Sequence, residues 1–389
     1  MSWNTIVGQE QQVRVLKKAL SKNRLAHAYL FTGPDGTGKE AVAFEIARIL
    51  NCTDPGLSPE SGACDTCLSC IRVNRFMHPN IEYVFPVEAA LLEQVDPSRK
   101  ENKRLQEARE RYQALIEEKK RNPYYSPAME RSMGILTDQV VMLQEKAILS
   151  PREGGKKVFI ISQAERLHPS AANKLLKLLE EPPPHVVFIL VSSNPDAVLP
   201  TIRSRCQPVL FGRIAPAELE SAITSICPEI NDTERRFIAG FCRGNLRIAV
   251  DLLNSRDQAG TVPPMLGIRN QALDYLRNVL SPQRFHEAIG FCEELSKTVS
   301  RPELVMFLSS LLLFFQDVLH RTLDPGFPDL NNPDITASVD RFVKGFPGRD
   351  LYRASSLTEE AIRAIQGNAS PLLVLAAYTV EIKTLLHRA

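Results

Sequence analysis

The sequence has no large excess of charge of either sign. Its 389 residues include 47 Lys and Arg against 45 Asp and Glu, a net charge of +2, so no strongly basic surface is expected, although a local patch would not show in this sum. No N-terminal stretch combines a basic start with an apolar segment, which argues against a secretory signal. The longest apolar run, Leu304 to Leu319, is short for a membrane span and contains polar residues, so we expect a buried helix. These absences predict a cytoplasmic chain with no membrane partner, in which the cysteines stay reduced.

One part of a common nucleotide site is also missing. Residues 33–40 read Gly-Pro-Asp-Gly-Thr-Gly-Lys-Glu, which fits the phosphate-binding loop G-x-x-x-x-G-K between a strand pattern and a helix pattern. The next residue is normally Ser or Thr, whose hydroxyl coordinates Mg²⁺, whereas this chain has Glu40, a carboxylate that would repel phosphates. We predict the loop geometry but leave open whether ATP or ADP binds. The predicted residues of this degenerate nucleotide site are Gly33, Gly36, Thr37, Gly38 and Lys39, together with Arg247 from a later helix pattern.

The second metal position has no carboxylate either. Nucleotidases of this layout place an Asp, often followed by a Glu, directly after a buried strand. Here the strand pattern at 157–161 is followed by Ser162 and Gln163, and Glu165 comes too late to replace either residue. Phosphoryl transfer depends on positioning and on charge neutralisation by the metal. We therefore expect no Mg²⁺ site and no appreciable ATP hydrolysis by this chain alone.

Four of the eight cysteines fall within nineteen residues, at Cys52, Cys64, Cys67 and Cys70. The Cys-x₂-Cys-x₂-Cys spacing lets three thiolates converge, and the first cysteine lies within loop reach. Four thiolates suit tetrahedral Zn²⁺, although an iron–sulfur cluster uses similar spacing. A closed site leaves no open position for catalysis, so we predict a structural zinc module over residues 52–70. The other four cysteines lie on apolar stretches and are expected in the core: Cys206, Cys227, Cys242 and Cys292.

Two arginines are candidates for contact with a phosphate. Arg205 follows the last buried strand pattern, 186–191, by a short connection, where it could reach a neighbour's γ-phosphate as an arginine finger. The alternative, which chemistry alone favours, is an ion pair with a local carboxylate. Arg247 begins a helix pattern and could either sense a phosphate or lie on the surface.

The patterns along the chain predict several domains. A composition of 44% hydrophobic and 24% charged residues over this length is typical of a soluble protein with two or three domains. Strand and helix patterns alternate over 1–209, which predicts an α/β domain with a mainly parallel sheet. Residues 210–256 are expected to form a small helical domain, and 257–389 a larger one, with a polar linker at 255–264. A charged insertion at about 88–133 is interpreted as an exposed amphipathic helix without a partner.

Taken together, these residues resemble the clamp loader of bacterial DNA polymerase III, an AAA+ family. The resemblance rests on Ile6-Val7-Gly8-Gln9, residues 27–34, the four clustered cysteines, Asn173 to Pro183 and Ser204-Arg205-Cys206. It covers about the first 255 residues, and the helical remainder is similar in layout only. The resemblance implies an AAA+ P-loop domain with an embedded zinc module, followed by a helical lid domain and a helical collar domain for oligomerisation. The charged insertion departs from the shorter family form.

Two kinds of clamp-loader subunit share this layout. Gamma/tau motor subunits keep the metal ligands, whereas the delta prime subunit typically loses them, keeps the zinc module and acts as a stator. The losses at Glu40, Ser162 and Gln163 favour delta prime. The resemblance then implies that Arg205 acts in trans on a neighbour's ATP site. It also implies gamma/tau and delta subunits as partners, with the sliding clamp and primed DNA reached through the complex. Arg247 matches the second sensor position, and Asn194 lies near the first.

Two other functions stay open. The chain could be an atypical ATP-hydrolysing gamma/tau-like motor subunit in which Glu40 or Glu165 coordinates the metal. It could also be a zinc-containing DNA-binding protein that acts alone, with salt-dependent affinity for DNA. The small net charge and the lack of an interleaved aromatic and basic stripe count against this last function.

Overall fold

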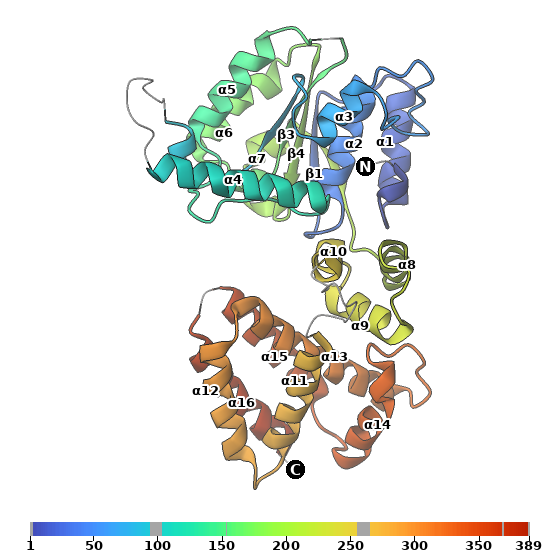
Figure 1. The fold of residues 1–389 in the computed structure, drawn as a ribbon, viewed down its shortest axis with the longest axis vertical. Coiled ribbons are helices and arrows are strands. Elements are labelled where there is room, and N and C mark those ends of the chain that lie inside the picture. The colour runs from blue at the N-terminus through green and yellow to red at the C-terminus, as the bar shows by residue number, and fades with distance from the viewer. Residues whose placement is uncertain (1–2, 94–102, 153, 255–264, 368, 388–389) are drawn as a thin grey trace. The chain divides into compact units, whose positions relative to one another are not determined.

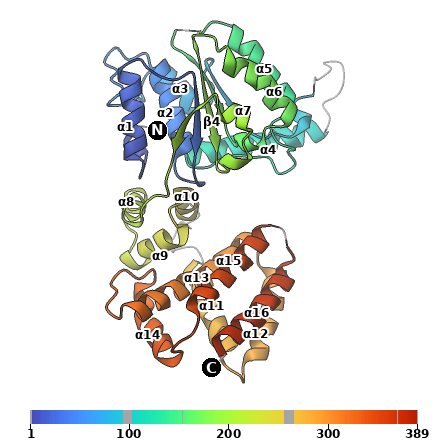
Figure 2. The same cartoon turned by 180° about the vertical axis from the view of Figure 1, so that it is seen from behind.

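The chain divides into two compact units in a computed structural model, which describes residues 3–93, 103–152, 154–254, 265–367 and 369–387 (Figures 1 and 2). The first unit, here the P-loop unit, comprises residues 1–222 and 244–251. The second, here the helical unit, comprises residues 223–243 and 252–389. The linker predicted at 255–264 and residues 94–102 of the predicted charged insertion lie outside the described residues. The division of the helical part into a lid and a collar stays a prediction.

The P-loop unit contains a parallel five-stranded sheet with the order β2-β3-β4-β1-β5. The strands are β1 (Ala28–Thr32), β2 (Ile81–Val84), β3 (Lys157–Ile161), β4 (Val186–Ser192) and β5 (Gln207–Leu210). Strands β1, β3 and β4 are buried along their whole length, as their continuous apolar sequences predict for strands covered on both faces. The predicted α/β class with a parallel sheet is therefore confirmed. Strand β5 was not predicted.

Helices cover both faces of this sheet (Figure 1). Side chains that alternate along the strands point to opposite faces: Phe31 belongs to the core cluster on the α2 side, and Leu30 to the cluster on the α5 and α6 side. The α-helices within or bordering this unit are α1 (Glu10–Ser21), α2 (Lys39–Asn51), α3 (Leu68–Asn74), α4 (Lys103–Arg121), α5 (Thr137–Ile148), α6 (Pro169–Glu180), α7 (Pro200–Arg203), α8 (Pro216–Ile226) and α10 (Leu246–Asn254). The short 3-10 helices are η1 (Trp3–Thr5), η2 (Ala89–Leu91), η3 (Ala164–Arg166) and η4 (Pro195–Ala197).

The helical unit is built around α13 (Arg301–Leu323), which packs against α11, α14 and α15. Among the described helices, α13 alone is long and apolar enough to cross a membrane, but Leu308, Leu311 and Phe315 are fully buried in the core of this unit. The predicted buried helix is thus confirmed. The other elements are α9 (Asp232–Cys242), α11 (Met265–Leu280), α12 (Phe285–Thr298), η5 (Pro333–Ile335), α14 (Thr336–Gly345), α15 (Leu351–Gln366) and α16 (Pro371–His387).

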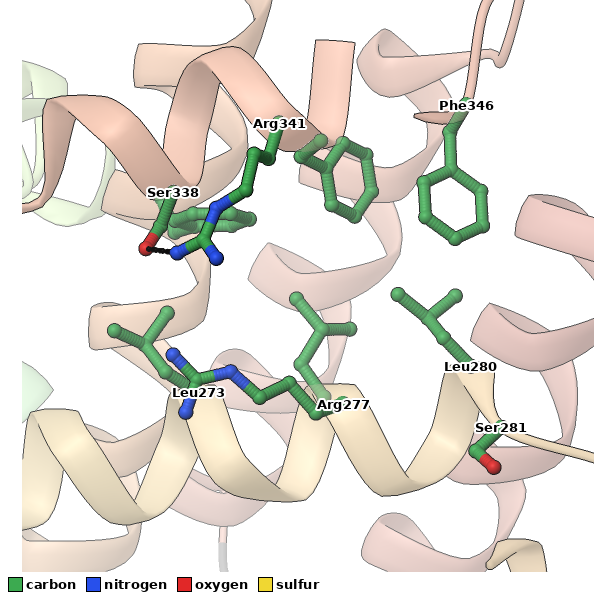
Figure 3. Close-up of a pocket in the computed structure, with 10 residues that line it drawn as sticks. Leu273, Arg277, Leu280, Ser281, Ser338, Arg341 and Phe346 are labelled. Atoms are coloured by element: carbon green, nitrogen blue, oxygen red, sulfur yellow. Dashed lines mark hydrogen bonds between the residues drawn. The ribbon is translucent and has the colours of Figure 1, made fainter. Parts of the chain in front are cut away.

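A cavity of about 410 Å³ lies between α11, α13 and α14 (Figure 3). Its walls are mainly apolar, and Arg277 and Arg341 line it as well. Arg277 pairs with Asp274, and Nη2 of Arg341 donates a hydrogen bond to Ser338 Oγ at 3.1 Å. Both guanidinium groups therefore have partners on their own helices.

Candidate functional site

The phosphate loop follows β1 and leads directly into α2, as the strand–loop–helix pattern predicts. Gly33, Gly36 and Gly38 have φ angles of 143°, 68° and 91°, a region in which side chains other than glycine are strained. The loop lysine turns back onto the loop, because Lys39 Nζ donates to the carbonyl oxygens of Gly33 and Pro34, both at 2.6 Å. Burial lowers the pKa of Lys39, and nearby carboxylates offset part of that effect.

Glu40 is buried beside the loop, where three protein side chains contact its carboxylate. Its carboxylate accepts a hydrogen bond from the Tyr83 hydroxyl at 2.6 Å and another from Ser162 Oγ. Its Oε2 also lies 2.6 Å from the ammonium nitrogen of Lys119. Burial raises the pKa of Glu40. The charge of Lys119 and these hydrogen bonds lower it by more, so the net shift of the pKa is downward. The carboxylate is therefore ionised, and the positive charge of Lys119 balances its negative charge inside the protein.

Lys119 reaches this site from α4, the helix of the charged insertion. Its side chain is completely buried, and Nζ also donates to the carbonyl oxygens of Pro123 at 2.7 Å and Tyr125 at 2.5 Å. The interpretation of this helix as solvated and without a partner is therefore wrong at Lys119. The helical period gave a usable signal: Lys119 lies seven residues after Tyr112, on the same apolar face. The neighbouring Lys120 lies on a more exposed face and pairs with Glu117.

The residues after α4 also contact the phosphate loop. A Cβ on Gly38 would lie 3.0 Å from the Tyr124 ring, so this ring packs directly on the loop. The Tyr124 hydroxyl donates to the carbonyl oxygen of Thr5 at 2.9 Å and accepts from the amide of Val7 at 3.2 Å. The hydroxyl end of the Tyr124 side chain is therefore fixed by two hydrogen bonds to the backbone.

The two expected sensor positions differ in their surroundings. Arg247 on α10 places its guanidinium 4.5 Å from the centre of the Tyr125 ring, and its Nε lies 3.5 Å from Asp251. The Leu246 amide donates to the carbonyl oxygen of Gly36 at 3.0 Å, so the start of α10 touches the phosphate loop. Asn194 is exposed after β4.

The polar residues at and after the end of β3 each have a partner within the protein. Ser162 is buried and bound to Glu40, as described above. Gln163 Nε2 donates to the carbonyl oxygen of Pro127 in the insertion at 3.0 Å. Glu165 lies in η3, where its Oε1 accepts a hydrogen bond from Ser193 Oγ at 3.2 Å.

Arg205 forms the local ion pair that the sequence left open. Its Nη2 lies 2.6 Å from Glu180 Oε1, at the end of α6, and its Nη1 donates to the carbonyl oxygen of Thr201 at 2.9 Å. The two side chains are 35% and 49% exposed. The pair is therefore open to solvent and to any neighbouring protein.

The four clustered cysteines bring their sulfur atoms together. All four Sγ atoms lie within 4.8 Å of one another, with Cys52 to Cys64 at 3.5 Å and Cys64 to Cys70 at 3.9 Å. Four sulfurs around a tetrahedral zinc with bonds of about 2.3 Å would be about 3.8 Å apart. Backbone amides of Cys67 and Cys70 donate to Cys64 Sγ and Cys67 Sγ, as suits thiolate ligands. The cluster can thus hold a metal ion, and its donor set fits zinc. The other four cysteines are buried, as expected.

Buried charges attach this cysteine segment to α2. Arg48 pairs with Glu45 at 3.0 Å and with Asp65, and neither Arg48 nor Glu45 is exposed. Glu45 Oε1 also accepts a hydrogen bond from the amide of Ala63 at 3.0 Å. The segment is therefore fastened to the helix that begins at the phosphate loop.

The comparisons with known proteins identify the family. A family model described as "DNA polymerase III, delta subunit" matches residues 8–215, more than half of the chain. The chain belongs to this family. The predicted resemblance to the clamp-loader family of DNA polymerase III is therefore confirmed.

Relatives include both kinds of subunit. DNA polymerase III subunit delta' of Bacillus subtilis is 28% identical over 324 residues, which cover 82% of this chain and 80% of that protein. Subunit tau of the same organism is 24% identical over 397 residues, covering 99% and 62%. Subunit gamma/tau of Mycobacterium tuberculosis is 30% identical over 228 residues, covering 59% and 32%. The chain thus spans about a third of the length of the mycobacterial relatives. A solved gamma subunit-related protein of Thermotoga maritima is 16% identical, covers 97% of this chain and 100% of that one, and has a TM-score of 0.43.

Proposed function

We propose that this chain is a delta-prime-like stator of the bacterial DNA polymerase III clamp loader. In this role it lends Arg205 to the ATP site of a neighbouring gamma/tau subunit while the sliding clamp is placed on primed DNA. Membership of the DNA polymerase III delta subunit family supports a place in the clamp-loader complex. The single observation that carries the stator role is the state of Glu40, which stands in the metal-ligand position of the phosphate loop.

Both carboxylate oxygens of Glu40 have protein partners. One oxygen accepts from Ser162, and the other contacts Tyr83 and Lys119. A divalent cation would need these oxygens, and it would be repelled by the ammonium group. Without a metal to neutralise phosphate charge, the chain lacks the main device of phosphoryl transfer. This argues against the motor alternative, in which Glu40 would coordinate the metal.

Arg205 is held loosely enough to act elsewhere. Its ion pair with Glu180 is half-exposed, and such pairs contribute about 0.2–1 kcal/mol. A γ-phosphate of a neighbour offers the guanidinium a stronger, bidentate partner. The exchange of Glu180 for a phosphate therefore costs little.

The remaining parts have structural roles in this proposal. Cys52, Cys64, Cys67 and Cys70 hold one Zn²⁺, which braces the segment attached to α2. The helical unit supplies the collar that assembles this chain with the delta and gamma/tau subunits in the bacterial cytoplasm. The P-loop unit is an AAA+ domain whose own site does not turn over ATP.

The test compares complexes assembled with wild-type chain, Arg205→Ala or Arg203→Ala. Arg203 is the matched control, because it lies two residues away and is 44% exposed, in a weaker pair with Asp196. Single-turnover ATP hydrolysis is measured with clamp and primed DNA. An arginine finger contributes about 10³–10⁵-fold to the rate at the site that it completes. We expect Arg205→Ala to remove hydrolysis at one class of site and Arg203→Ala to preserve it.

Two results would contradict the proposal. Full hydrolysis by a correctly assembled Arg205→Ala complex would exclude the role in trans. Magnesium-dependent ATP turnover by the isolated chain would favour the gamma/tau-like motor function instead.

A further inference from the structure

Residues 119–125, here the plug segment, connect the end of α4 to the phosphate loop. Lys119, Asn122 and Tyr124 are 0%, 0% and 7% exposed, so three side chains of the segment are buried inside the P-loop unit, while Lys120 and Arg121 between them are exposed. We propose that the plug segment is a built-in occupant of the nucleotide site, with the Lys119 ammonium in place of the divalent cation. A nucleoside di- or triphosphate then binds only when the segment leaves. This inference is independent of the role of Arg205.

The surroundings of Lys119 Nζ are those of a cation bound by oxygen atoms. Three oxygens lie within 2.7 Å: Oε2 of Glu40 and the carbonyl oxygens of Pro123 and Tyr125. A hard divalent cation takes the same carboxylate and carbonyl ligands. Two positive charges at one such position repel each other strongly where water is excluded. The ammonium group and a metal ion therefore compete for Glu40.

The hydroxyl and the carboxylate at the two metal-ligand positions stand in each other's usual places. P-loop nucleotidases place a hydroxyl after the loop lysine and a carboxylate at the strand end. This chain has the carboxylate of Glu40 after the lysine and the hydroxyl of Ser162 after β3, and the two are hydrogen-bonded. The pair of groups that would surround a cation is retained in reverse order. The cation beside Glu40 is the Lys119 ammonium group, which is covalently part of the chain.

The plug segment also covers the phosphate position. Amides at the start of a helix after a glycine-rich loop bind phosphate, and α2 begins at Lys39. The Tyr124 ring packs against Gly38 at this start, and its hydroxyl is tied to the backbone of Thr5 and Val7. Lys39 is meanwhile bonded to loop carbonyls. The groups that would hold phosphate oxygens are thus covered or already paired.

The far side of the plug segment is attached to α10. Asn122 Nδ2 donates to Asp251 Oδ1 at 2.6 Å and to the carbonyl oxygen of Arg247 at 3.1 Å. The Tyr125 ring lies under the Arg247 guanidinium at 4.5 Å. The arginine expected at the second sensor position therefore contacts the plug segment.

The experiment measures equilibrium binding of ATP and ADP by the full chain, by calorimetry, with Mg²⁺ and with a chelator. The variants are Tyr124→Ala, which uncovers Gly38, and the double variant Lys119→Met with Glu40→Gln, which removes both buried charges together. Tyr352→Ala is the matched control, because Tyr352 is 78% exposed on α15 of the helical unit. Trp3 fluorescence verifies that the P-loop unit of each variant is folded, and far-UV circular dichroism verifies the helical unit of Tyr352→Ala.

We expect the wild type and Tyr352→Ala to bind nucleotide with a Kd above about 1 mM, and Tyr124→Ala to bind at least ~10-fold more tightly. The double variant lacks the Lys119 ammonium group that competes with a bound metal ion, so it should also bind nucleotide more tightly than the wild type. Should the wild type bind nucleotide, hydrogen exchange of residues 119–125 must rise on binding.

Two outcomes would overturn the proposal. One is folded Tyr124→Ala and double variants that bind nucleotide no better than the wild type. The other is micromolar binding by the wild type with unchanged hydrogen exchange in the plug segment. Neither measurement reads ATP hydrolysis in the assembled complex, so failure here is distinguishable from failure of the stator proposal.

Discussion

The ion pair between Glu40 and Lys119 allows a quantitative prediction about stability. The two residues are 4% and 0% exposed, and their charged atoms are 2.6 Å apart. Lys119→Met preserves much of the side-chain volume but leaves the Glu40 carboxylate without its counter-charge. Removing one partner of a buried pair costs about 3–5 kcal/mol. Because Tyr83 and Ser162 still donate hydrogen bonds to Glu40, we expect a loss of about 3 kcal/mol, at the lower end of this range.

Two further variants separate charge from packing. The double variant Lys119→Met with Glu40→Gln leaves no buried charge, and replacing a whole buried pair is often close to neutral. It should therefore recover most of the loss. Lys120→Met is the matched control on the adjacent, more exposed position, where surface substitutions change stability by about 0.5 kcal/mol or less.

The sequence provides a natural probe for this measurement. Trp3 is the only tryptophan, is 4% exposed and belongs to the core cluster on the α2 face of the sheet. Its fluorescence during urea unfolding therefore reports the P-loop unit separately from the helical unit. A loss below about 1 kcal/mol for Lys119→Met, or one equal to that of Lys120→Met, would refute the argument that a buried, ionised pair holds the insertion in place.

The same pair gives a pH dependence with a defined sign. Burial raises the pKa of Glu40, but Lys119 and the hydrogen bonds outweigh it, so the folded pKa lies below the unfolded value of about 4.3. A depressed carboxyl pKa contributes stability that is present above the unfolded pKa and is lost as pH falls through the folded pKa. The stability advantage of the wild type over Glu40→Gln should therefore shrink below about pH 4.

Two further predictions concern the cysteine cluster and the phosphate loop. The purified chain should contain one zinc ion, and Cys67→Ser should lose it. Cys206→Ser changes a buried thiol outside the cluster and should keep the zinc. Structural zinc contributes on the order of 10 kcal/mol to local folding, so hydrogen exchange around the cluster should rise in Cys67→Ser. Unchanged zinc content in Cys67→Ser would contradict this assignment. Gly33→Ala would place a Cβ 2.2 Å from the carbonyl oxygen of Phe211 at a φ of +143°, so its urea midpoint should fall by an amount equivalent to more than about 1 kcal/mol. Gly267→Ala, in helix α11, where apart from the adjoining backbone of the helix nothing lies within 4 Å of the new Cβ, should instead gain about 0.5–1 kcal/mol. A change of the same sign in both variants would refute the steric explanation.

The sequence predicted the sheet well where strands are buried on both faces. Strands β1, β3 and β4 are continuous apolar runs, and that pattern reports burial directly. Strand β5 gave no such signal, because it lies at the edge of the sheet, is largely exposed and contains Pro208. Its pairing with β1 is a tertiary contact that local periodicity does not encode.

In the candidate site, too, local sequence patterns were predictable and a long-range contact was not. The cysteine cluster was predictable because its spacing is local in sequence, and the glycine loop was predictable for the same reason. The partner of Glu40 was not, because Lys119 is far away in sequence and stands in a run of basic residues, Lys119-Lys120-Arg121. Only its position on the apolar face of the helix distinguishes it from its neighbours.

The burial of each cation separates the two roles proposed for this chain. Lys119 is enclosed with Glu40, so its withdrawal would leave a buried charge and cost about 3–5 kcal/mol. Arg205 shares a half-exposed pair with Glu180, and its release costs about 0.2–1 kcal/mol. A group that must reach the phosphate of another subunit has to leave its local partner at small cost, whereas a group that closes a site has to stay. In the two proposals, burial therefore keeps Lys119 beside the chain's own phosphate loop, and exposure leaves Arg205 available to a neighbouring subunit.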